Sequence, residues 1–449
     1  MIYVKDIINL CNGKLLCGDI NFECINFCKD TREINKGDIY VGIKGETFNG
    51  NNFYKDAFKN GASLCILDYD TIIDNEYIND NYAIILVNDT VDCLQKLASY
   101  KRDLYDIPVV AVTGSVGKTS VKDIISSVLS SKYNVLSTKG NLNNHIGLPL
   151  TMLNLNDSHQ VLVVEMGMNH FDEIHVLSMI ARPTISIITN IGTAHIGILG
   201  SRENILKAKL EILDGMDGGY LIVNNDNDLL RTVKYDNLVT VGVDNNSDFM
   251  ANNIFEDVFS SSFYINDMHV SLPVGSKAFI YNALFAFAVG TKLGMSLDEI
   301  SDSLKEFKLS PHRLELIKTD KINIIDDTYN ASYDSVKNSL ELLSKVNGRK
   351  VFIFADILEL DEFGKEIHTD IGKLVIENNI DVFITVGDLA KYSYNVVKSA
   401  NKECYYFENN DELLKVISNI LSEKDTVLLK GSNGMRLIDV SEYLRNNMK

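Results

Sequence analysis

The sequence predicts an α/β protein with three domains, on three observations. Short apolar runs of strand character recur along all 449 residues and alternate with helical or turn segments. A chain of this length is expected to form two to four domains, at about 100–200 residues each. Three regions can be separated by pattern, with boundaries near residues 104 and 311. We therefore expect domains of residues 1–104, 105–311 and 312–449.

The first region is expected to form a small α/β domain. Its apolar runs are short and interrupted by Gly and Asn, as at Ile39–Ile43, Leu64–Leu67 and Ala83–Val87. A polar helix over Asp92–Asp106, followed by Pro108, indicates where the domain ends.

The second region begins with a buried strand at Val109–Thr113, a tight loop over residues 114–118 and a helix from Thr119. One apolar face of that helix is formed by Val121, Ile124, Ile125, Val128 and Leu129. Further strands are predicted at Val161–Val164, Ile185–Ile188 and Tyr220–Val223. Because these strands are apolar on both faces and separated by helices, we expect a mostly parallel sheet. Residues 244–272 are expected to add a hairpin-bearing excursion.

The third region repeats the alternation of strands and helices. Its apolar runs are Ile322–Ile325, Val351–Ala355, Val382–Val386 and Val427–Leu429, at about the spacing of βαβ units. We expect an independent, doubly wound domain of Rossmann-like type.

Charge and hydropathy limit the function classes. The chain has 61 Asp and Glu against 43 Lys and Arg, a net charge of −18, which argues against binding to duplex nucleic acid. No run approaches the roughly 18 apolar residues of a membrane span. The N-terminus lacks the pattern of a signal peptide. We therefore expect a cytoplasmic protein that contacts neither nucleic acid nor membrane.

Seven cysteines, an odd number, favour a reducing compartment over a disulfide framework. Four of them, Cys11, Cys17, Cys24 and Cys28, gather near the N-terminus. A zinc site is one interpretation, but the spacings are irregular and no CxxC pair occurs. Buried thiols that act as small apolar side chains are the alternative, and the one we favour.

The strongest local motif follows the strand that ends at Thr113. It consists of Gly114, Ser115, Val116, Gly117, Lys118, Thr119 and Ser120. Glycines let the backbone wrap a phosphate, the lysine reaches the outer phosphates of ATP, and a hydroxyl at Thr119 or Ser120 ligates Mg²⁺. The usual first glycine of a P-loop is replaced by Val112. An ordinary strand–turn–helix is the alternative interpretation.

Three further residues follow or accompany this motif. Glu165 ends a predicted strand, where a carboxylate would meet ligands at the sheet edge, unless it merely caps a helix. His195 follows the strand Ile185–Ile188 and is a candidate functional residue, although a histidine at this position could instead have a structural role. Lys209 lies on a predicted helix, and a lysine there is usually solvated.

A polar cluster, Asp326–Ala331, follows the first strand of the third region. Two acids, a hydroxyl and an amide at the carboxyl end of a strand are well placed to meet a ligand, although an Asx-rich turn is the alternative. Residues 355–360 and 430–433 are expected at the same edge of the domain, as ligand contacts or as solvated loops.

With these residues in place, the chain resembles the Mur ligases of peptidoglycan synthesis. The resemblance runs from Asp30–Arg32 to Lys430–Ser432, and its most specific segments are Gly140–Pro149 and Asp326–Ala331. It implies a UDP-precursor-binding N-terminal domain, a central ATPase domain and a C-terminal domain that closes over ATP. Within the family it implies the members that join D-alanyl-D-alanine to UDP-N-acetylmuramoyl-tripeptide through an acyl phosphate.

The resemblance also implies residue roles. Lys118, Glu165, His195 and Lys209 are implied to be catalytic, with Thr119 and Glu165 at a first Mg²⁺ and His195 and a carbamylated Lys209 at a second. Nucleotide contacts are implied for Asn282, Arg313 and Asp327. Substrate contacts are implied for Thr31, Arg32, Lys44, Gly45, Asn143, Asn144, Tyr329 and Asn330. The chain departs from the family pattern at Ala278, Phe279 and Asn433.

Two kinds of alternative remain open at this point. One is a sister ligase that adds a single amino acid, or a folylpolyglutamate synthetase. The other is a nucleotide-binding scaffold without catalysis. The segment Asp326–Asn330 favours the ligase that adds the dipeptide, and a monomer is expected from the family.

Overall fold

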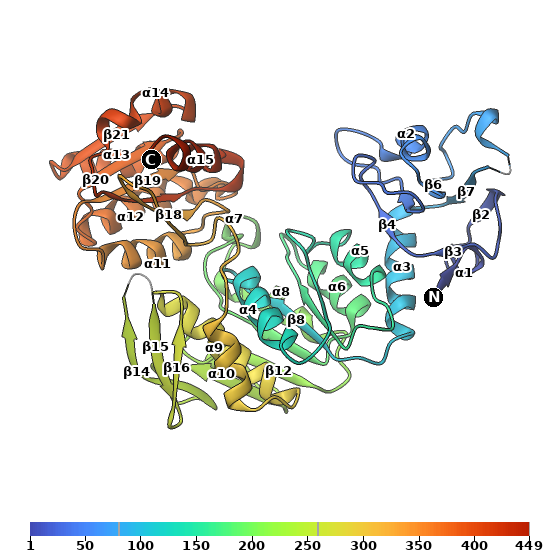
Figure 1. The fold of residues 1–449 in the computed structure, drawn as a ribbon, viewed down its shortest axis with the longest axis horizontal. Helices are drawn as coiled ribbons and strands as arrows, with labels where there is room; N and C mark the ends of the chain where they lie inside the picture. Colours follow the sequence, from blue (N-terminus) through green and yellow to red (C-terminus); the bar gives the residue numbers. More distant parts are fainter. Residues whose placement is uncertain (80, 258–259, 449) are drawn as a thin grey trace. The chain divides into compact units, whose positions relative to one another are not determined.

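The computed structural model describes residues 1–79, 81–257 and 260–448. Contacts within the chain define two compact units. The first consists of Met1–Thr113, Lys132–Ile187 and Ala208–Leu221, and the second of Gly114–Ser131, Ile188–Lys207 and Ile222–Lys449. Figure 1 shows an α/β chain in which helices accompany each of the larger sheets. In the described part of the chain, no helix has both the length and the apolar character to cross a membrane.

The N-terminal sheet has five strands in the order β2-β7-β6-β5-β4. All its pairings are parallel except that of β2 with β7. Its bounds are β2 Lys14–Cys17, β4 Phe27–Cys28, β5 Ile39–Val41, β6 Leu64–Asp68 and β7 Ala83–Val87. A two-stranded ribbon pairs β1 (Ile2–Tyr3) with β3 (Glu23–Cys24). The accompanying helices are α1 Val4–Cys11, η1 Gly50–Phe53, α2 Tyr54–Lys59, η2 Asn75–Tyr77 and α3 Thr90–Asp103.

Two predicted elements of this region have different bounds. β5 ends at Val41 rather than at Ile43, and at Gly42, where a Cβ would lie 2.8 Å from the backbone of Asn51, the chain of η1 approaches closely. α3 begins at Thr90, since the Asp89 side chain accepts hydrogen bonds from the first turn.

The central sheet has nine strands in the order β16-β15-β14-β13-β12-β11-β8-β10-β9. β8 pairs parallel to β10, and β10 pairs parallel to β9. The strands are β8 Val109–Thr113, β9 Val135–Ser137, β10 Val161–Glu165, β11 Ile185–Ile188, β12 Tyr220–Asn224, β13 Leu238–Gly242, β14 Phe249–Glu256, β15 Ser261–Ile265 and β16 Met268–Leu272. The expected excursion is therefore confirmed as antiparallel β14–β16, apart from residues 258–259, which lie outside the described residues.

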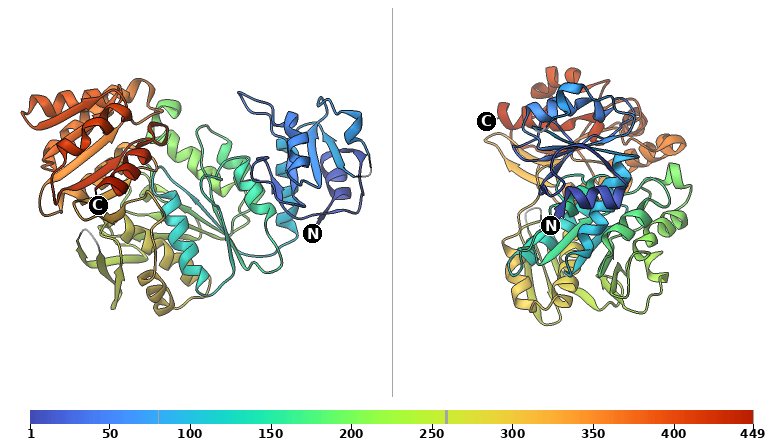
Figure 2. Two further views of the ribbon diagram at one scale, coloured as in Figure 1. Left: turned by 45° about the horizontal axis from the view of Figure 1, so that its top comes forward. Right: turned by 90° about the vertical axis from the view of Figure 1, so that its right-hand side faces the viewer.

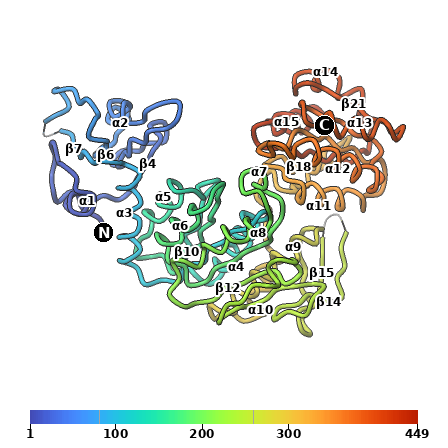
Figure 3. Tube along the Cα trace, turned by 180° about the vertical axis from the view of Figure 1, so that it is seen from behind, coloured from blue at the N-terminus to red at the C-terminus, as the bar shows by residue number. Residues whose placement is uncertain are grey.

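Most helices of the central region connect successive strands of this sheet along the chain, and α9 and α10 follow its last strand. Within the second unit, α9 packs on α4 and on β13–β15, and α10 packs on β16, as the trace in Figure 3 lets the reader follow. The helices are α4 Lys118–Ser130, α5 Gly147–Leu153, α6 Glu173–Ala181, α7 Ile196–Leu199, α8 Arg202–Leu210, η3 Glu211–Leu213, η4 Leu230–Thr232, α9 Lys277–Lys292 and α10 Leu297–Lys305. The predicted apolar face of α4 is buried.

The C-terminal sheet has six strands in the order β17-β18-β22-β19-β20-β21. All neighbours are parallel except β17 and β18. The strands are β17 Glu315–Lys318, β18 Asn323–Asp327, β19 Lys350–Ala355, β20 Val382–Val386, β21 Glu403–Phe407 and β22 Thr426–Lys430.

Helices cover both faces of this sheet (Figure 2). One face packs its aliphatic residues against α14 and α15, and α11, α12 and α13 pack together in sequence order. Their bounds are α11 Tyr333–Ser344, η5 Asp361–Phe363, α12 Gly364–Glu377, α13 Ala390–Ser399, α14 Asn410–Ile420, η6 Asn433–Met435 and α15 Leu437–Asn447. The expectation of a doubly wound domain is confirmed.

Candidate active site

The predicted phosphate loop connects the end of β8 to the start of α4. Gly114 has φ +152° and Gly117 has φ +82°, conformations that residues with a Cβ rarely adopt. A Cβ on Gly114 would lie 1.9 Å from Oγ1 of Thr189. Only glycine therefore fits this turn, and the backbone approaches the end of β11 closely.

The segment after β11 braces the loop from the side. The Ser115 N–H donates to the Asn190 carbonyl at 3.0 Å, and the Val116 N–H donates to Asn190 Oδ1 at 2.9 Å. The Gly192 N–H in turn donates to Ser115 Oγ at 2.9 Å. The first turn of α4 follows this braced loop, and backbone N–H groups at a helix N-terminus are the donors that an anion is expected to meet.

Lys118 is the first residue of α4 and folds back over the loop. Its Nζ donates to the Gly114 carbonyl at 2.8 Å. Lys118, Thr119 and Ser120 are all half-buried. The loop thus carries one ammonium and two hydroxyls beside the positive end of a helix, a suitable environment for a phosphate.

Glu165 ends β10 and is only 2% exposed. Its backbone N–H donates to Thr138 Oγ1 at 3.0 Å, and its Oε1 accepts from Asn143 Nδ2 at 2.8 Å. Among the described residues, no hydrogen-bond donor reaches its buried Oε2. Burial of a carboxylate oxygen without a hydrogen-bond partner costs free energy, which a ligand bound to this oxygen would offset.

A divalent cation fits this carboxylate. Mg²⁺ takes oxygen ligands and usually engages one or two carboxylates together with substrate phosphates. Oε2 of Glu165 is an oxygen of this kind, and the hydroxyls of Thr119 and Ser120 belong to the same class of ligand. β10 ends in register with Val112 of β8, whose chain continues into the phosphate loop.

His195 and Lys209 differ in their surroundings. His195 is half-buried at φ +65° and immediately precedes α7. Lys209, on α8, is 1% exposed, whereas Lys207 on the same helix is exposed. The expectation that a lysine on this helix is solvated is therefore wrong for Lys209, because its side chain faces the core.

Asn282 lies on α9 and is buried. Its neighbour Tyr281 donates through its hydroxyl to Asp226 Oδ2 at 2.7 Å. Asp226 also accepts from the N–H groups of Val243, Asp244 and Asn245. The carboxylate therefore ties α9 to the turn after β13.

At the edge of the C-terminal sheet, β18 and β22 end side by side. Asp327 pairs in register with Lys430, and Lys430 Nζ lies 2.5 Å from Asp327 Oδ2. Ser339 Oγ donates to the same carboxylate oxygen at 2.7 Å. The loops that follow are joined as well, since the Asn433 N–H donates to Asn330 Oδ1 at 3.3 Å. The predicted juxtaposition of residues 326–331 and 430–433 is thus observed.

Arg313 stacks on Tyr329, with its guanidinium carbon 3.7 Å from the ring centre. Nearby, His312, Glu315 and Asp326 form a group with the composition of a metal site. Asp326 is already engaged by His312, Ser441 and Arg445. Burial alone would raise the pKa of Asp326, but hydrogen bonds from Ser441, Thr328 and His312 lower it. This group is therefore a saturated structural network.

The predicted contacts in the N-terminal domain follow two parallel strands. Thr31 and Arg32 come after β4, and Lys44 and Gly45 come after β5, so both pairs leave the same sheet edge. The Arg32 side chain, 86% exposed, forms a two-point ion pair with Asp30. This hydrogen-bonded pairing lowers the pKa of Asp30 to about 2.

The N-terminal cysteines do not converge. None of the seven cysteines, all of which the structure describes, forms a disulfide, and Cys11, Cys17 and Cys28 donate to different backbone carbonyls. Burial raises the pKa of the Cys24 thiol to about 12. The interpretation as buried thiols is favoured over a zinc site.

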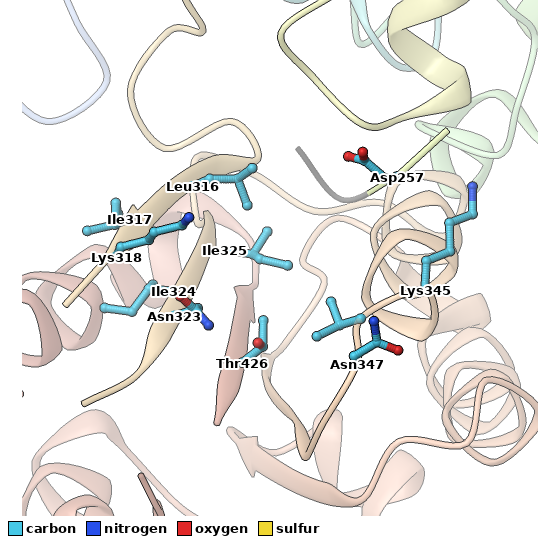
Figure 4. A pocket seen from close by; sticks show the side chains of 11 residues that line it. Asp257, Leu316, Ile317, Lys318, Asn323, Ile324, Ile325, Lys345, Asn347 and Thr426 are labelled. Carbon is cyan, nitrogen blue, oxygen red and sulfur yellow. The ribbon is translucent and has the colours of Figure 1, made fainter. Parts of the chain in front are cut away.

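A pocket elsewhere in the second unit is lined by none of the predicted site residues (Figure 4). Ile325 and Leu316 contribute apolar surface, and Lys318 and Lys345 contribute charge. Lys345 forms an ion pair with Glu256. The pocket offers no support for a nucleotide site.

Sequence reasoning missed several residues that hold the site. Asn190 accepts a hydrogen bond from the phosphate loop, and Thr138 accepts one from the backbone of Glu165. Asp226 accepts a hydrogen bond from the hydroxyl of Tyr281. Asn190 follows the predicted strand Ile185–Ile188 directly, and its position at a strand end was the available signal. Thr138 and Asp226 carried no signal, because their contacts bridge residues 27 and 55 positions apart.

The fold and the phosphate loop agree with comparisons with known proteins. The Mur ligase middle domain matches residues 112–290, and the Mur ligase glutamate ligase domain matches residues 312–433. The chain therefore belongs to the Mur ligase family.

Its relatives include the UDP-N-acetylmuramoyl-tripeptide–D-alanyl-D-alanine ligases of Bacillus subtilis and Escherichia coli. The first is 35% identical over 98% of both chains. The second is 31% identical over 99% of this chain and 98% of its own. Among solved structures, MurF from Acinetobacter baumannii has a TM-score of 0.89 at 29% identity and 99% coverage of both chains. MurF ligase from Thermotoga maritima in complex with ADP has a TM-score of 0.82 at 28% identity, covering 94% of this chain and 98% of its own.

Proposed function

We propose that this protein joins D-alanyl-D-alanine to UDP-N-acetylmuramoyl-tripeptide with the consumption of ATP, in the synthesis of peptidoglycan precursors. The observation that carries the proposal is similarity along almost the whole chain to ligases of this activity, 35% identity over 98% of both chains in one case. The phosphate loop and the partnerless oxygen of Glu165 support a nucleotide and a metal in the central domain.

The chemistry requires activation of a carboxylate. An amine does not displace oxide from a carboxylate anion, because oxide is a very poor leaving group. Transfer of the γ-phosphoryl of ATP to the tripeptide carboxylate gives an acyl phosphate, and the amine of the dipeptide then displaces phosphate. The two reacting anions repel each other, by about 1 kcal/mol per pair of unit charges at about 4 Å in water and several-fold more in a drier site.

The residues of the central domain would counter this repulsion. Lys118 and the first turn of α4 hold the phosphates by charge and N–H donors. Thr119 and Glu165 would hold one Mg²⁺, and His195 with a carbamylated Lys209 would hold a second. When bound, these ions supply positive charge at the transferring phosphoryl group. Burial of Lys209 supports a role other than that of a solvated lysine.

The remaining roles are assigned by family resemblance. Asn282, Arg313 and Asp327 would contact the nucleotide, and Thr31, Arg32, Lys44 and Gly45 the uridine end of the precursor. Asn143, Asn144, Tyr329 and Asn330 would contact substrate. The division into residues 1–104, 105–311 and 312–449, a monomeric state and a cytoplasmic location without membrane or nucleic-acid partners are further parts of the proposal.

An acceptor screen tests the function. Phosphate release from ATP is measured with UDP-N-acetylmuramoyl-tripeptide and D-alanyl-D-alanine, with UDP-N-acetylmuramoyl precursors of shorter peptide and single amino acids, and with a folate and glutamate. We expect release with the dipeptide only. Release with a single amino acid identifies a sister ligase, release with a folate and glutamate a folylpolyglutamate synthetase, and no release with any acceptor a non-catalytic nucleotide-binding protein.

A further inference from the structure

The side chain of Asn143 is held on both sides by residues at the end of β10. Its Nδ2 donates to Glu165 Oε1 at 2.8 Å, and its backbone carbonyl accepts from the Gly167 N–H at 2.9 Å. A Cβ on Gly167 would lie 3.1 Å from the amide atoms of Asn143. The backbone of Gly167 therefore packs against the amide group and restricts its rotation.

Glu165 is fixed at two points as a result. Thr138 Oγ1 accepts from its backbone N–H, and Asn143 donates to one of its two carboxylate oxygens. The other oxygen is buried and has no hydrogen-bond donor among the residues described. The two oxygens are thus distinguished: one is occupied by an amide donor and the other is left for a ligand.

We propose that Asn143 is a positioning residue, which holds Oε1 of Glu165 so that Oε2 is presented to a divalent cation. The inference deepens the proposed function, on which it rests for the metal role of Glu165, and it gives Asn143 a role other than substrate contact. A hydrogen-bonded partner of a metal ligand fixes the ligand's orientation before the metal binds. Without the amide, both oxygens are equivalent and the side chain must be ordered on binding.

The neighbouring residue, Asn144, provides a matched control. Its Oδ1 accepts from the N–H groups of Ile146 and Gly147, at 3.2 and 2.9 Å, at the start of α5. It stabilises the helix start in the same segment but makes none of the contacts to Glu165 described above. The substrate contact assigned to Asn144 does not enter the measurement, because the assay contains ADP and Mn²⁺ but no precursor, so loss of its amide tests whether disturbance of the segment alone affects the metal.

The experiment measures Mn²⁺ binding to the full chain in the presence of ADP, by electron paramagnetic resonance. We expect Asn143→Ala to weaken Mn²⁺ binding about tenfold or more. Gly167→Ala, which pushes against the amide, is expected to weaken it in the same direction. Asn143→Gln, which keeps the donor, is expected to recover part of the loss. Asn144→Ala is expected to lower the thermal unfolding midpoint and keep Mn²⁺ affinity within about twofold of the original chain.

Mn²⁺ affinity that is unchanged in both Asn143→Ala and Gly167→Ala overturns the inference, as does an equal loss in Asn144→Ala. Circular dichroism shows whether each variant is folded. If Asn143→Ala is unfolded, Gly167→Ala is used in its place to test the inference. Failure of the proposed function is distinguishable, because it appears as tight Mn²⁺ binding without ligation of any acceptor. A chain that ligates the dipeptide and binds Mn²⁺ independently of Asn143 contradicts the inference alone.

Discussion

At the scale of single residues, two lysines of the candidate site occupy contrasting environments. Lys118 is half-buried and reaches the Gly114 carbonyl, so its ammonium lies over the phosphate loop. Lys209 is enclosed in the protein, where an ammonium loses its hydration. The position of Lys118 suits an ammonium that meets phosphates. The position of Lys209 suits the carbamylated lysine of the proposed function.

Lys209→Ala is expected to reduce ligation by about 100-fold or more, because it removes a group that stabilises charge in the reaction. A small carboxylic acid such as acetate is expected to restore part of the activity, since it supplies the oxygens that a carbamate would supply. The control is Lys207→Ala, an exposed lysine on the same helix. Steady-state phosphate release measures both variants, and full activity of Lys209→Ala contradicts the proposed role.

At the scale of elements, the contact between the phosphate loop and the end of β11 determines the loop's shape. Gly114→Ala places a methyl group against Thr189 Oγ1, at a backbone angle that alanine rarely adopts. We expect loss of ADP binding together with a lower unfolding temperature. Gly117→Ala is the comparison, because no atom lies within 4 Å of its Cβ position and only backbone strain of about 1–2 kcal/mol is added. Calorimetric titration with ADP that shows equal affinity for Gly114→Ala and the original chain would contradict the assigned geometry.

The link between α9 and the turn after β13 depends on an ionised carboxylate. Burial raises the pKa of Asp226, but hydrogen bonds from Val243, Asp244 and Tyr281 outweigh it and lower the pKa to about 2. A carboxyl whose pKa is depressed in the folded state stabilises the fold above its unfolded value, about 3.9. That stabilisation is lost as the pH falls from about 4 towards 2.

Asp226→Asn is accordingly expected to lower the free energy of unfolding by about 1–3 kcal/mol at neutral pH, because an NH2 donor replaces one of the two acceptor oxygens and the donors that faced that oxygen lose their acceptor. The difference from the original chain should shrink below about pH 4, where Asp226 itself takes up a proton. Urea unfolding at neutral and acidic pH measures the difference, with the exposed Asp236→Asn as control. A difference that stays constant with pH would contradict the ionised role.

At the scale of the whole molecule, the sequence predicted a mostly parallel central sheet and a doubly wound C-terminal sheet, but not the contacts that hold the site. Apolar runs such as Val161–Val164 and Val382–Val386 identify strands because burial on both faces leaves a continuous apolar pattern. Glu165 was predictable, since strand ends meet at one sheet edge. Its partner Thr138 was not, because the packing of β9 beside β10 joins them only after folding. Burial of Lys209 had a signal in the sequence, because Lys209 lies four residues after Ile205 and three before Ile212, both of which are buried, but the usual exposure of lysine outweighed it.

The proposed nucleotide contacts are spread over distant parts of the chain, and this spread predicts a domain motion. Residues of the phosphate loop and Arg313 are assigned to one ATP molecule, so the C-terminal domain is expected to close when nucleotide and precursor bind. The linker residues Leu309–Pro311 are the expected hinge, because closure of this kind is absorbed by a few residues between elements. Small-angle X-ray scattering with and without a non-hydrolysable ATP analogue, Mg²⁺ and precursor measures the change, and we expect a smaller radius of gyration with ligands.

The Gly114→Ala chain, which should not bind nucleotide, is the control. Identical scattering of the original chain in both conditions would contradict closure, while a decrease that persists in Gly114→Ala would show that nucleotide does not drive it.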